Sequence, residues 1–291
     1  IRMLVAVRDT LAPRARLARL EAHGAGLLRL YGNKGAVGCT LWVGPTSLCF
    51  VGAHLAAHAH HLARRHEDLR QLLAGLRLGV GTADLQAEVH HLFLLGDLNY
   101  RLQRDPTLEG PLPKKDPAHH AEVLAGIERR EWPSLLQSDQ LRAAVRAGFL
   151  HGFAEGPPLF APTFKLVVGQ RLTYTEKRVP SYCDRVLWHS ATEHAARLRQ
   201  ASYISCDSLL SSDHAAVMAT FDLDVPSHLA PPPLLADEAR QQLRTAAAAG
   251  TSSSAGIAGT TAAAATAAVA GDTAAAPQLR LRLTELAVRG V

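Results

Sequence analysis

Short apolar runs alternate with polar turns along the first 225 residues of the chain. Six of these runs have the length and composition of buried strands, at residues 1–7, 36–43, 48–53, 91–95, 183–188 and 216–225. The turn Gly44-Pro45-Thr46-Ser47 separates the second run from the third, and this arrangement predicts a β-hairpin.

Helical periodicity marks three further segments. Within residues 60–78 the leucines at 62, 69, 72, 73 and 76 fall on one helical face, with Arg64, Arg65 and Arg70 distributed around the other. Residues 118–130 and 132–147 are also predicted to be helical. Because strands and helices alternate imperfectly, we expect an α/β sandwich of two mixed sheets with helices outside.

The composition changes abruptly after Val225. A proline cluster at 231–233 is followed by an Ala/Thr/Ser/Gly tract that cannot bury enough surface to offset its chain entropy. We therefore expect one folded domain over 1–225 and a disordered linker over 226–277. The alternation at the start of 278–291 predicts a strand, either the beginning of a truncated second domain or a chance pattern.

The composition bears on the cellular compartment and on the class of binding partner more than on the reaction. The 291 residues are 47% hydrophobic, enough for a substantial core, and carry a net charge of +5. That charge suits a phosphoinositide headgroup, an acidic membrane surface or nucleic acid, and does not choose among them. Four scattered cysteines indicate a reducing, cytoplasmic setting, and without an apolar run of membrane-spanning length we expect any membrane contact to be peripheral.

Acidic side chains stand at the ends of two predicted strands. Asp97 and Asn99 follow the run at 91–95, and two residues apart on extended backbone they point the same way. Asp184 opens the strand at 183–188, and the pair Asp213-His214 precedes the last strand. A buried strand delivers such groups to a sheet edge, although an Asp-Leu-Asn run can also simply cap a turn.

Two runs carry a resemblance to a known family. Gly96-Asp97-Leu98-Asn99-Tyr100-Arg101 and Pro180-Ser181-Tyr182-Cys183-Asp184-Arg185-Val186-Leu187 resemble the two signature motifs of the inositol polyphosphate 5-phosphatases. Five more blocks resemble the family in the same order: Asn33 to Val37, His54 to Ala57, Asp139 to Leu141, Phe160 to Lys165 and Ser212 to His214.

The resemblance implies a fold and a reaction. The fold would be the two-sheet sandwich of the endonuclease/exonuclease/phosphatase type. The reaction would be Mg²⁺-dependent hydrolysis of the 5-phosphate of phosphoinositides, such as phosphatidylinositol 4,5-bisphosphate or 3,4,5-trisphosphate, or of soluble inositol polyphosphates, by in-line attack of water. A cytoplasmic, peripherally membrane-associated enzyme is the corresponding expectation.

The resemblance also implies catalytic roles. Asp97 would orient and deprotonate the water, and Asn99 would donate a hydrogen bond to the phosphate. His214 would stabilise charge on the phosphoryl group, with Asp184 fixing its tautomer and raising its pKa. Asp213 would serve the metal and water network, and His54 would contact the scissile phosphate.

Substrate-binding residues follow from the same comparison. Lys165 and Arg178 match positions that bind the 4-phosphate, whereas Phe164 stands where the family commonly has tyrosine. Lys177 lies one place from the usual lysine. The remaining candidates for substrate binding are Asn33, Lys34 and Arg101.

The metal site is where the sequence departs from the family. The family's glutamate ligand to Mg²⁺ belongs to a Gln-Glu pair near the amino terminus, and nothing before Arg8 matches it. We therefore expect that the amino-terminal part of the sandwich is missing, that the ligand lies upstream of Ile1, with Asp213 a further possible ligand, and that this chain alone is poorly stable and inactive.

Three alternatives stay open at this stage. The first is a non-catalytic phosphoinositide-binding module that has lost the metal site. The second, a nuclease of the same superfamily, fits the basic charge but does not explain Lys165 together with Arg178. The third is local: His58, His60, His61 and His66 are interpreted as solvated residues, although three of them lie close enough together to permit a metal site.

Overall fold

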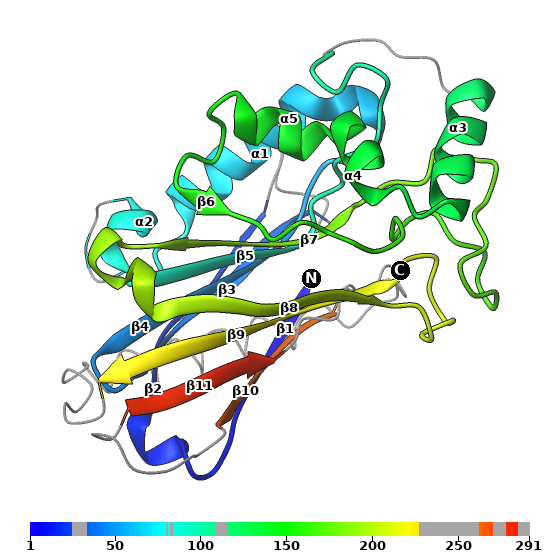
Figure 1. Cartoon of the computed structure of the whole chain (residues 1–291). Coiled ribbons are helices and arrows are strands. Elements are labelled where there is room, and N and C mark those ends of the chain that lie inside the picture. The colour runs from blue at the N-terminus through cyan, green and yellow to red at the C-terminus, as the bar shows by residue number, and fades with distance from the viewer. Residues whose placement is uncertain are drawn as a thin grey trace, which may run out of the picture.

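Two β-sheets packed face to face form the centre of the computed structural model (Figure 1). The structure describes residues 1–24, 34–79, 81, 84–108 and 116–226, together with the backbone of 262–269 and 278–284. Helices α1, α4 and α5 lie over the outer face of the larger sheet (Figure 1). This is the predicted sandwich, with helices outside.

The larger sheet has six strands in the order β2 (Ala15–Gly24), β3 (Gly35–Val43), β4 (Thr46–His54), β5 (His91–Asp97), β7 (Asp184–Ser190) and β6 (Phe153–Ala154). Strand β5 pairs in parallel with β4 and antiparallel with β7, so the sheet is mixed. The predicted hairpin is confirmed as β3 and β4, which are joined at Gly44 with φ +53°.

The smaller sheet has five strands in the order β1 (Arg2–Val7), β10 (Ala262–Val269), β11 (Gln278–Thr284), β9 (Ala216–Pro226) and β8 (Leu198–Cys206). Strand β10 therefore lies within the tract from which we expected a disordered linker. Its backbone pairs with β1. The predicted strand at the start of 278–291 forms β11, which pairs with β9 in this same sheet.

The helices are α1 (Leu62–Gly75), α2 (Leu85–Glu88), α3 (Pro117–Glu128), α4 (Trp132–Leu135) and α5 (Gln140–Arg146), with short 3-10 turns η1 (Ala12–Arg14), η2 (Ala59–His61), η3 (Leu136–Ser138) and η4 (Thr192–Arg197). The single helix predicted over 132–147 is wrong. It is interrupted at Asp139, whose extended backbone starts α5 and whose carboxylate accepts the N–H of Arg142 as the helix cap.

Strand β5 shows why its sequence is apolar throughout. Phe93 and Leu95 face the core between the sheets, whereas Leu92 and Leu94 face the core beneath the helices. Because both faces are covered, no position within His91–Leu95 faces solvent. The strand is thereby held from both sides up to its last residue, Asp97.

Within the described residues, no helix is long and apolar enough to cross a membrane.

Candidate active site

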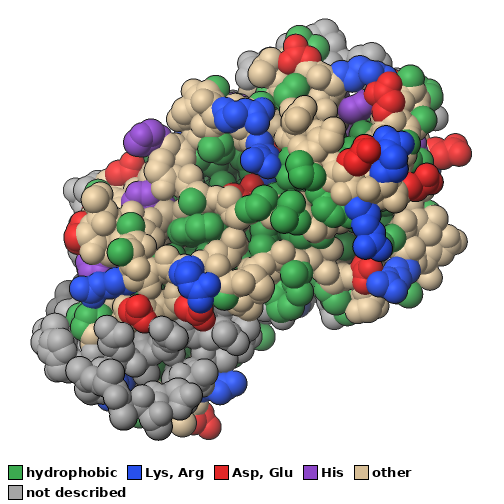
Figure 2. Space-filling view, in the orientation of Figure 1, with side chains coloured by type: hydrophobic (Ala, Val, Ile, Leu, Met, Phe, Trp, Pro, Cys, Tyr) green, Lys and Arg blue, Asp and Glu red, His purple; other side chains and the backbone are tan. Residues whose placement is uncertain are grey.

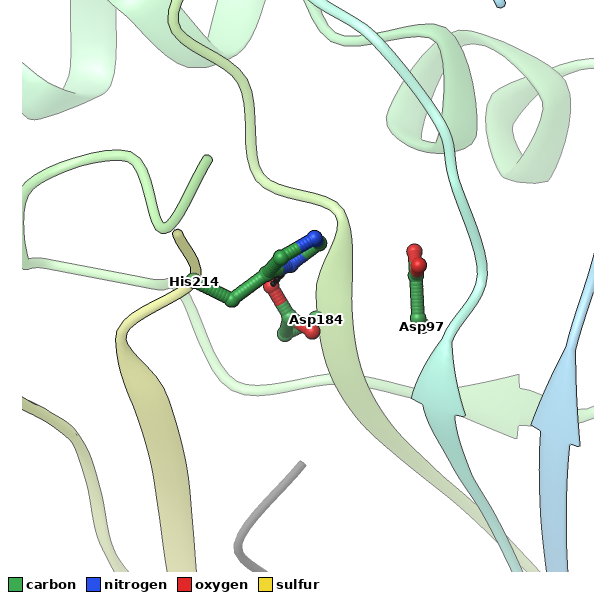
Figure 3. A group of neighbouring side chains, drawn as sticks. All are labelled: Asp97, Asp184 and His214. Atoms are coloured by element: carbon green, nitrogen blue, oxygen red, sulfur yellow. Dashed lines mark hydrogen bonds and ion pairs between the residues drawn. The ribbon is translucent and has the colours of Figure 1, made fainter. Parts of the chain in front are cut away.

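Three side chains predicted to act together lie in one row across neighbouring strands. His54 of β4 is the register partner of Asp97 on β5, and Asp97 is the register partner of Asp184 on β7. Each residue ends or begins its strand, so the row lies at the sheet edge. Figure 3 shows Asp97 on the strand beside Asp184, with the ring of His214 above the Asp184 carboxylate.

Asp97 is buried and held by several hydrogen bonds. The backbone N–H of Asn99 donates to Oδ1 at 3.0 Å, and the Asn99 side-chain amide donates to Oδ2 at 3.1 Å. His54 Nε2 lies 3.1 Å from the same Oδ2. Burial alone would raise the pKa of Asp97, but the hydrogen bond from His54 and the charge of His214 lower it well below its ordinary value. The carboxylate is therefore ionised at neutral pH.

His214 forms a buried pair with Asp184. Its Nδ1 lies 2.9 Å from Asp184 Oδ2, which also accepts the Thr163 hydroxyl at 2.6 Å. Burial lowers the pKa of His214, but the Asp184 carboxylate more than offsets this and raises it to about 9. His214 is consequently an imidazolium at neutral pH, with Nδ1–H directed to Asp184.

Asn99 links Asp97 to a basic side chain. Arg101 donates from Nε to the Asn99 carbonyl at 3.1 Å and from Nη2 to the Asn99 side-chain oxygen. The Asn99 amide nitrogen also donates to the Leu55 carbonyl at 3.1 Å. Both hydrogens of that amide thus have acceptors, and donation to a phosphate would require one of these bonds to be replaced.

An aromatic ring joins Arg101 to His214. The Arg101 guanidinium lies over the Phe164 ring at 4.5 Å, and the ring centroids of Phe164 and His214 are 4.5 Å apart. Phe164, noted in the sequence only for its missing hydroxyl, therefore packs between two charged groups of the site.

Three other predicted site residues lie beside the row, namely Lys34, Lys165 and Asp213. Lys34 contacts Nε2 of His54, and burial lowers its pKa. Lys165 forms an ion pair with Asp213. Asp213 is thus adjacent to His214 in the chain but directed to Lys165. Asn33 lies outside the described residues.

A cavity of about 780 Å³ opens beside Arg101, and Arg178 and Lys177 lie exposed on its lining. Its other walls come mainly from α3 and residues 102–108. Of the two predicted 4-phosphate residues, Arg178 lines this cavity and Lys165 does not. On the face shown in Figure 2, acidic and basic side chains are interspersed over the end of the molecule that carries α3.

One group of described side chains has the spacing to hold a metal ion. Ligand atoms of Asp97, Asp184 and His214 lie within 4.8 Å of one another. Asp184 Oδ1 is buried and, in the described part of the chain, has no hydrogen-bond partner. Carboxylate oxygen suits a hard cation such as Mg²⁺, whereas a protonated His214 cannot ligate, so Asp97 and Asp184 are the residues that fit.

Two features of this region were missed in the sequence. Thr163 lies within the Phe160–Lys165 block, but nothing in that block indicated that its hydroxyl bonds Asp184. Arg65, expected on the polar face of its helix, is fully buried. The cluster of His58, His60 and His61 lies outside the one metal-compatible group found among the described residues, and His58 and His60 are exposed.

The chain is similar in sequence to curated 5-phosphatases. Phosphatidylinositol 3,4,5-trisphosphate 5-phosphatase 2 of Sus scrofa is 35% identical over 216 residues, which are 69% of this chain and 16% of that protein. Type II inositol 1,4,5-trisphosphate 5-phosphatase of Mus musculus is 31% identical over 232 residues, 77% of this chain and 22% of that protein. The chain thus spans less than a quarter of the length of these relatives.

A solved structure agrees with the fold. The inositol polyphosphate 5-phosphatase domain of a synaptojanin, in complex with inositol (1,4)-bisphosphate and a calcium ion, matches with a TM-score of 0.62 and 25% identity over 83% of this chain and 66% of that one. The sequence pattern of the endonuclease/exonuclease/phosphatase family 2 matches residues 1–220. With the signature residues gathered at one sheet edge, the chain belongs to that family.

Proposed function

We propose that the chain hydrolyses the 5-phosphate of phosphoinositides or soluble inositol polyphosphates, with Mg²⁺ as cofactor. The observation that carries this proposal is the register row of His54, Asp97 and Asp184, with His214 bonded to the last of them. The 5-phosphatase names of the relatives and of the synaptojanin domain support the same reaction.

The site offers two charged groups for catalysis, the Asp97 carboxylate and the His214 imidazolium. Asp97 is ionised and accepts hydrogen bonds, so it can orient a water for in-line attack. Its lowered pKa makes it a weak base, which favours orientation over proton abstraction. The His214 imidazolium offsets charge that develops on the phosphoryl oxygens. Bound Mg²⁺, held by Asp97 and Asp184, would supply further positive charge there.

Substrate selection is proposed to lie at the cavity beside Arg101. Arg178 and Lys177 are exposed cations on its lining and are suited to the 4-phosphate, whereas Arg104, also exposed there, is paired with Asp116 and Glu122. The Lys165–Asp213 ion pair leaves Lys165 less suited to that role unless the pair separates. Arg178→Ala should therefore slow release from a 4,5-bisphosphate more than from a substrate without the 4-phosphate.

We further propose that the protein acts in the cytoplasm at an anionic membrane surface. Exposed aliphatic side chains project from two adjoining loops, at Val168, Leu172 and Leu210. The Gly169 N–H donates to the Leu210 carbonyl, and Leu166 N–H donates to the Asp213 carbonyl, so these loops are tied to the site. Such side chains can enter the interfacial region of a bilayer.

The test measures phosphate release by the purified chain. Inositol 1,4,5-trisphosphate in solution and phosphatidylinositol 4,5-bisphosphate in phosphatidylcholine vesicles are compared, each with Mg²⁺ and with excess EDTA. We expect chelator-sensitive release of the 5-phosphate alone, identified from the product, because Asp97 and Asp184 fit the metal without the upstream glutamate. That result would overturn the expectation from the sequence that this chain alone is inactive. Binding of either substrate without release would instead support the non-catalytic phosphoinositide-binding module.

A further inference from the structure

Within the part of the chain that the structure describes, Arg65 is a buried cation without a carboxylate partner. It is the fourth residue of α1, its side chain is fully buried, and no described carboxylate forms an ion pair with it. Burial, with the nearby charge of Arg101, lowers its pKa to about 10. By contrast Arg185, equally buried, is paired with Asp139 and Glu155. Burying a charge without an ion-pair partner costs desolvation free energy. We therefore expect the Arg65 guanidinium to donate to hydrogen-bond acceptors that a neutral side chain would leave unpaired.

Its acceptors belong to two separate parts of the chain. Nη1 donates to the carbonyls of Ala56 at 3.2 Å and His58 at 2.6 Å, and Nη2 donates to the carbonyl of Ala59 at 3.3 Å. Nη2 also donates to Gln140 Oε1 at 2.5 Å. The planar guanidinium thus holds three carbonyls of segment 56–59 and the first residue of α5 at once.

Gln140 extends this network to the signature motif. Its Oε1 also accepts the backbone N–H of Arg101 at 3.1 Å. Its Nε2 donates to the carbonyl of Ala59 at 3.1 Å and to Gln103 Oε1 at 2.7 Å. Arg65 and Gln140 therefore fix segment 56–59 and segment 101–103 relative to each other.

Both segments lead directly to Asp97 and Asn99. Leu55, which precedes the first segment, donates its N–H to the Asp97 carbonyl and accepts the Asn99 amide. Arg101, which begins the second, holds the carbonyl and side-chain oxygen of Asn99. A shift of either segment is thus passed to the groups that orient the Asp97 carboxylate.

We propose that Arg65 is a positioning residue of the active site. Its guanidinium fixes the turn after β4 and, through Gln140, the segment after the first signature motif, and so sets the orientation of Asn99 and Asp97. Among the described residues, no hydrogen bond or ion pair joins Arg65 to either of these two residues, so its effect on their orientation is indirect. This inference rests on the proposed phosphatase function.

The first test compares Arg65→Lys with Arg70→Lys in the full chain. Lysine keeps the charge but offers one nitrogen, which cannot serve both segments, whereas Arg70 is exposed on the same helix. Arg65→Lys should lower kcat about tenfold or more with KM changed less than about threefold, and Arg70→Lys should change neither. An unchanged kcat in folded Arg65→Lys would overturn the proposal.

A second variant separates positioning from stability. Gln140→Glu gives Arg65 a carboxylate partner but removes the donor to Ala59 and Gln103. We expect kcat to fall while the midpoint of thermal unfolding stays at or above that of the unchanged protein. Equal kcat, or a loss of kcat that only follows a loss of folded protein, would contradict the proposal.

A third experiment tests the positioning role of Arg65 without relying on enzyme activity. Amide hydrogen exchange of Arg65→Lys should be faster in peptides covering 55–61 and 99–103 and unchanged in β8. Uniformly faster exchange, or none in those peptides, would reject Arg65 as a positioning residue whatever the activity. Absence of phosphate release by the unchanged chain, with the local exchange pattern as expected, would reject only the proposed function.

Discussion

Asp97 and His214 carry opposite charges at neutral pH, and each owes its charge to a specific partner. His54 and His214 lower the pKa of Asp97, so this carboxylate stays ionised. Asp184 raises the pKa of His214, so this imidazole stays protonated. The pair therefore presents an acceptor for water and a cation for the phosphoryl group within one group of side chains. Loss of either charge should affect the transition state more than the bound substrate.

Asp97→Asn and His214→Asn test this directly. Each retains the approximate size of its side chain and removes its charge, so we expect kcat to fall by roughly 10²–10⁴. His214→Asn should also lower the free energy of unfolding, because it leaves the buried Asp184 without its cation. The rate of the unchanged enzyme should also fall above about pH 9 as His214 loses its proton. Steady-state kinetics across pH give both results.

His189→Gln is the matched control, since His189 lies on β7 with Asp184 but at the opposite end of the strand. It should keep the kcat of the unchanged chain. Near-normal turnover in a folded Asp97→Asn or His214→Asn would show that the assigned roles are mistaken.

At the scale of elements, the position of Asp97 depends on how closely β5 approaches β4. Gly96 has φ +129°, and a Cβ there would lie 2.1 Å from the Ala53 carbonyl oxygen. Only glycine permits this approach in the residue next to Asp97. The signature motif thus requires glycine at position 96 because the backbones of β4 and β5 approach closely there. This requirement concerns the placement of Asp97 and not contact with the substrate.

Gly96→Ala should therefore destabilise the protein by more than about 3 kcal/mol and abolish phosphate release, because the β4–β5 pairing must shift. Gly148→Ala is the comparison, since Gly148 also has a positive φ, of +91°, but open space around it. Backbone strain alone should limit its cost to about 1–2 kcal/mol. Urea denaturation measures both, and equal losses would show that the contact with Ala53 is unimportant.

The sequence predicted the central strands and the site residues on them, because continuous apolar runs and acids at their ends are local signals. It did not predict β2 or β8, whose residues alternate between part-buried and exposed positions without a clean period. It also placed Arg65 on the solvent side, since the carbonyls that need this donor lie in a turn whose course helical periodicity cannot show. The break at Asp139, by contrast, has a local cause that was missed, because the Asp139 carboxylate caps α5.

For the whole molecule, the buried His91 and the half-buried His66 limit stability in acid. Burial, with the neighbouring His194, lowers the pKa of His91 to about 3, and burial with Arg65 lowers that of His66 to about 4. Both stay neutral in the folded chain while the unfolded chain takes up protons below about pH 6.5. Their contribution is fully present above that pH and is lost as the pH falls toward the folded values.

The free energy of unfolding should accordingly decline from pH 6.5 to pH 5 by up to about 1.4 kcal/mol per pH unit for each of the two groups. His91→Gln cannot take up a proton and should reduce that slope, whereas replacement of the exposed His151 by glutamine should not. Urea denaturation at several pH values provides the slopes. Parallel curves for His91→Gln and the unchanged protein would refute this account.

The register row of His54, Asp97 and Asp184 has a further consequence for the order in which the chain acquires activity. β4 and β5 are separated in sequence by α1, and β5 and β7 by α3 to α5, so the row exists only after two distant pairings have closed. Such pairings form late and slowly during folding because long loops must be ordered first. Phosphate release during refolding should therefore return with completion of the larger sheet, after helical structure has already formed.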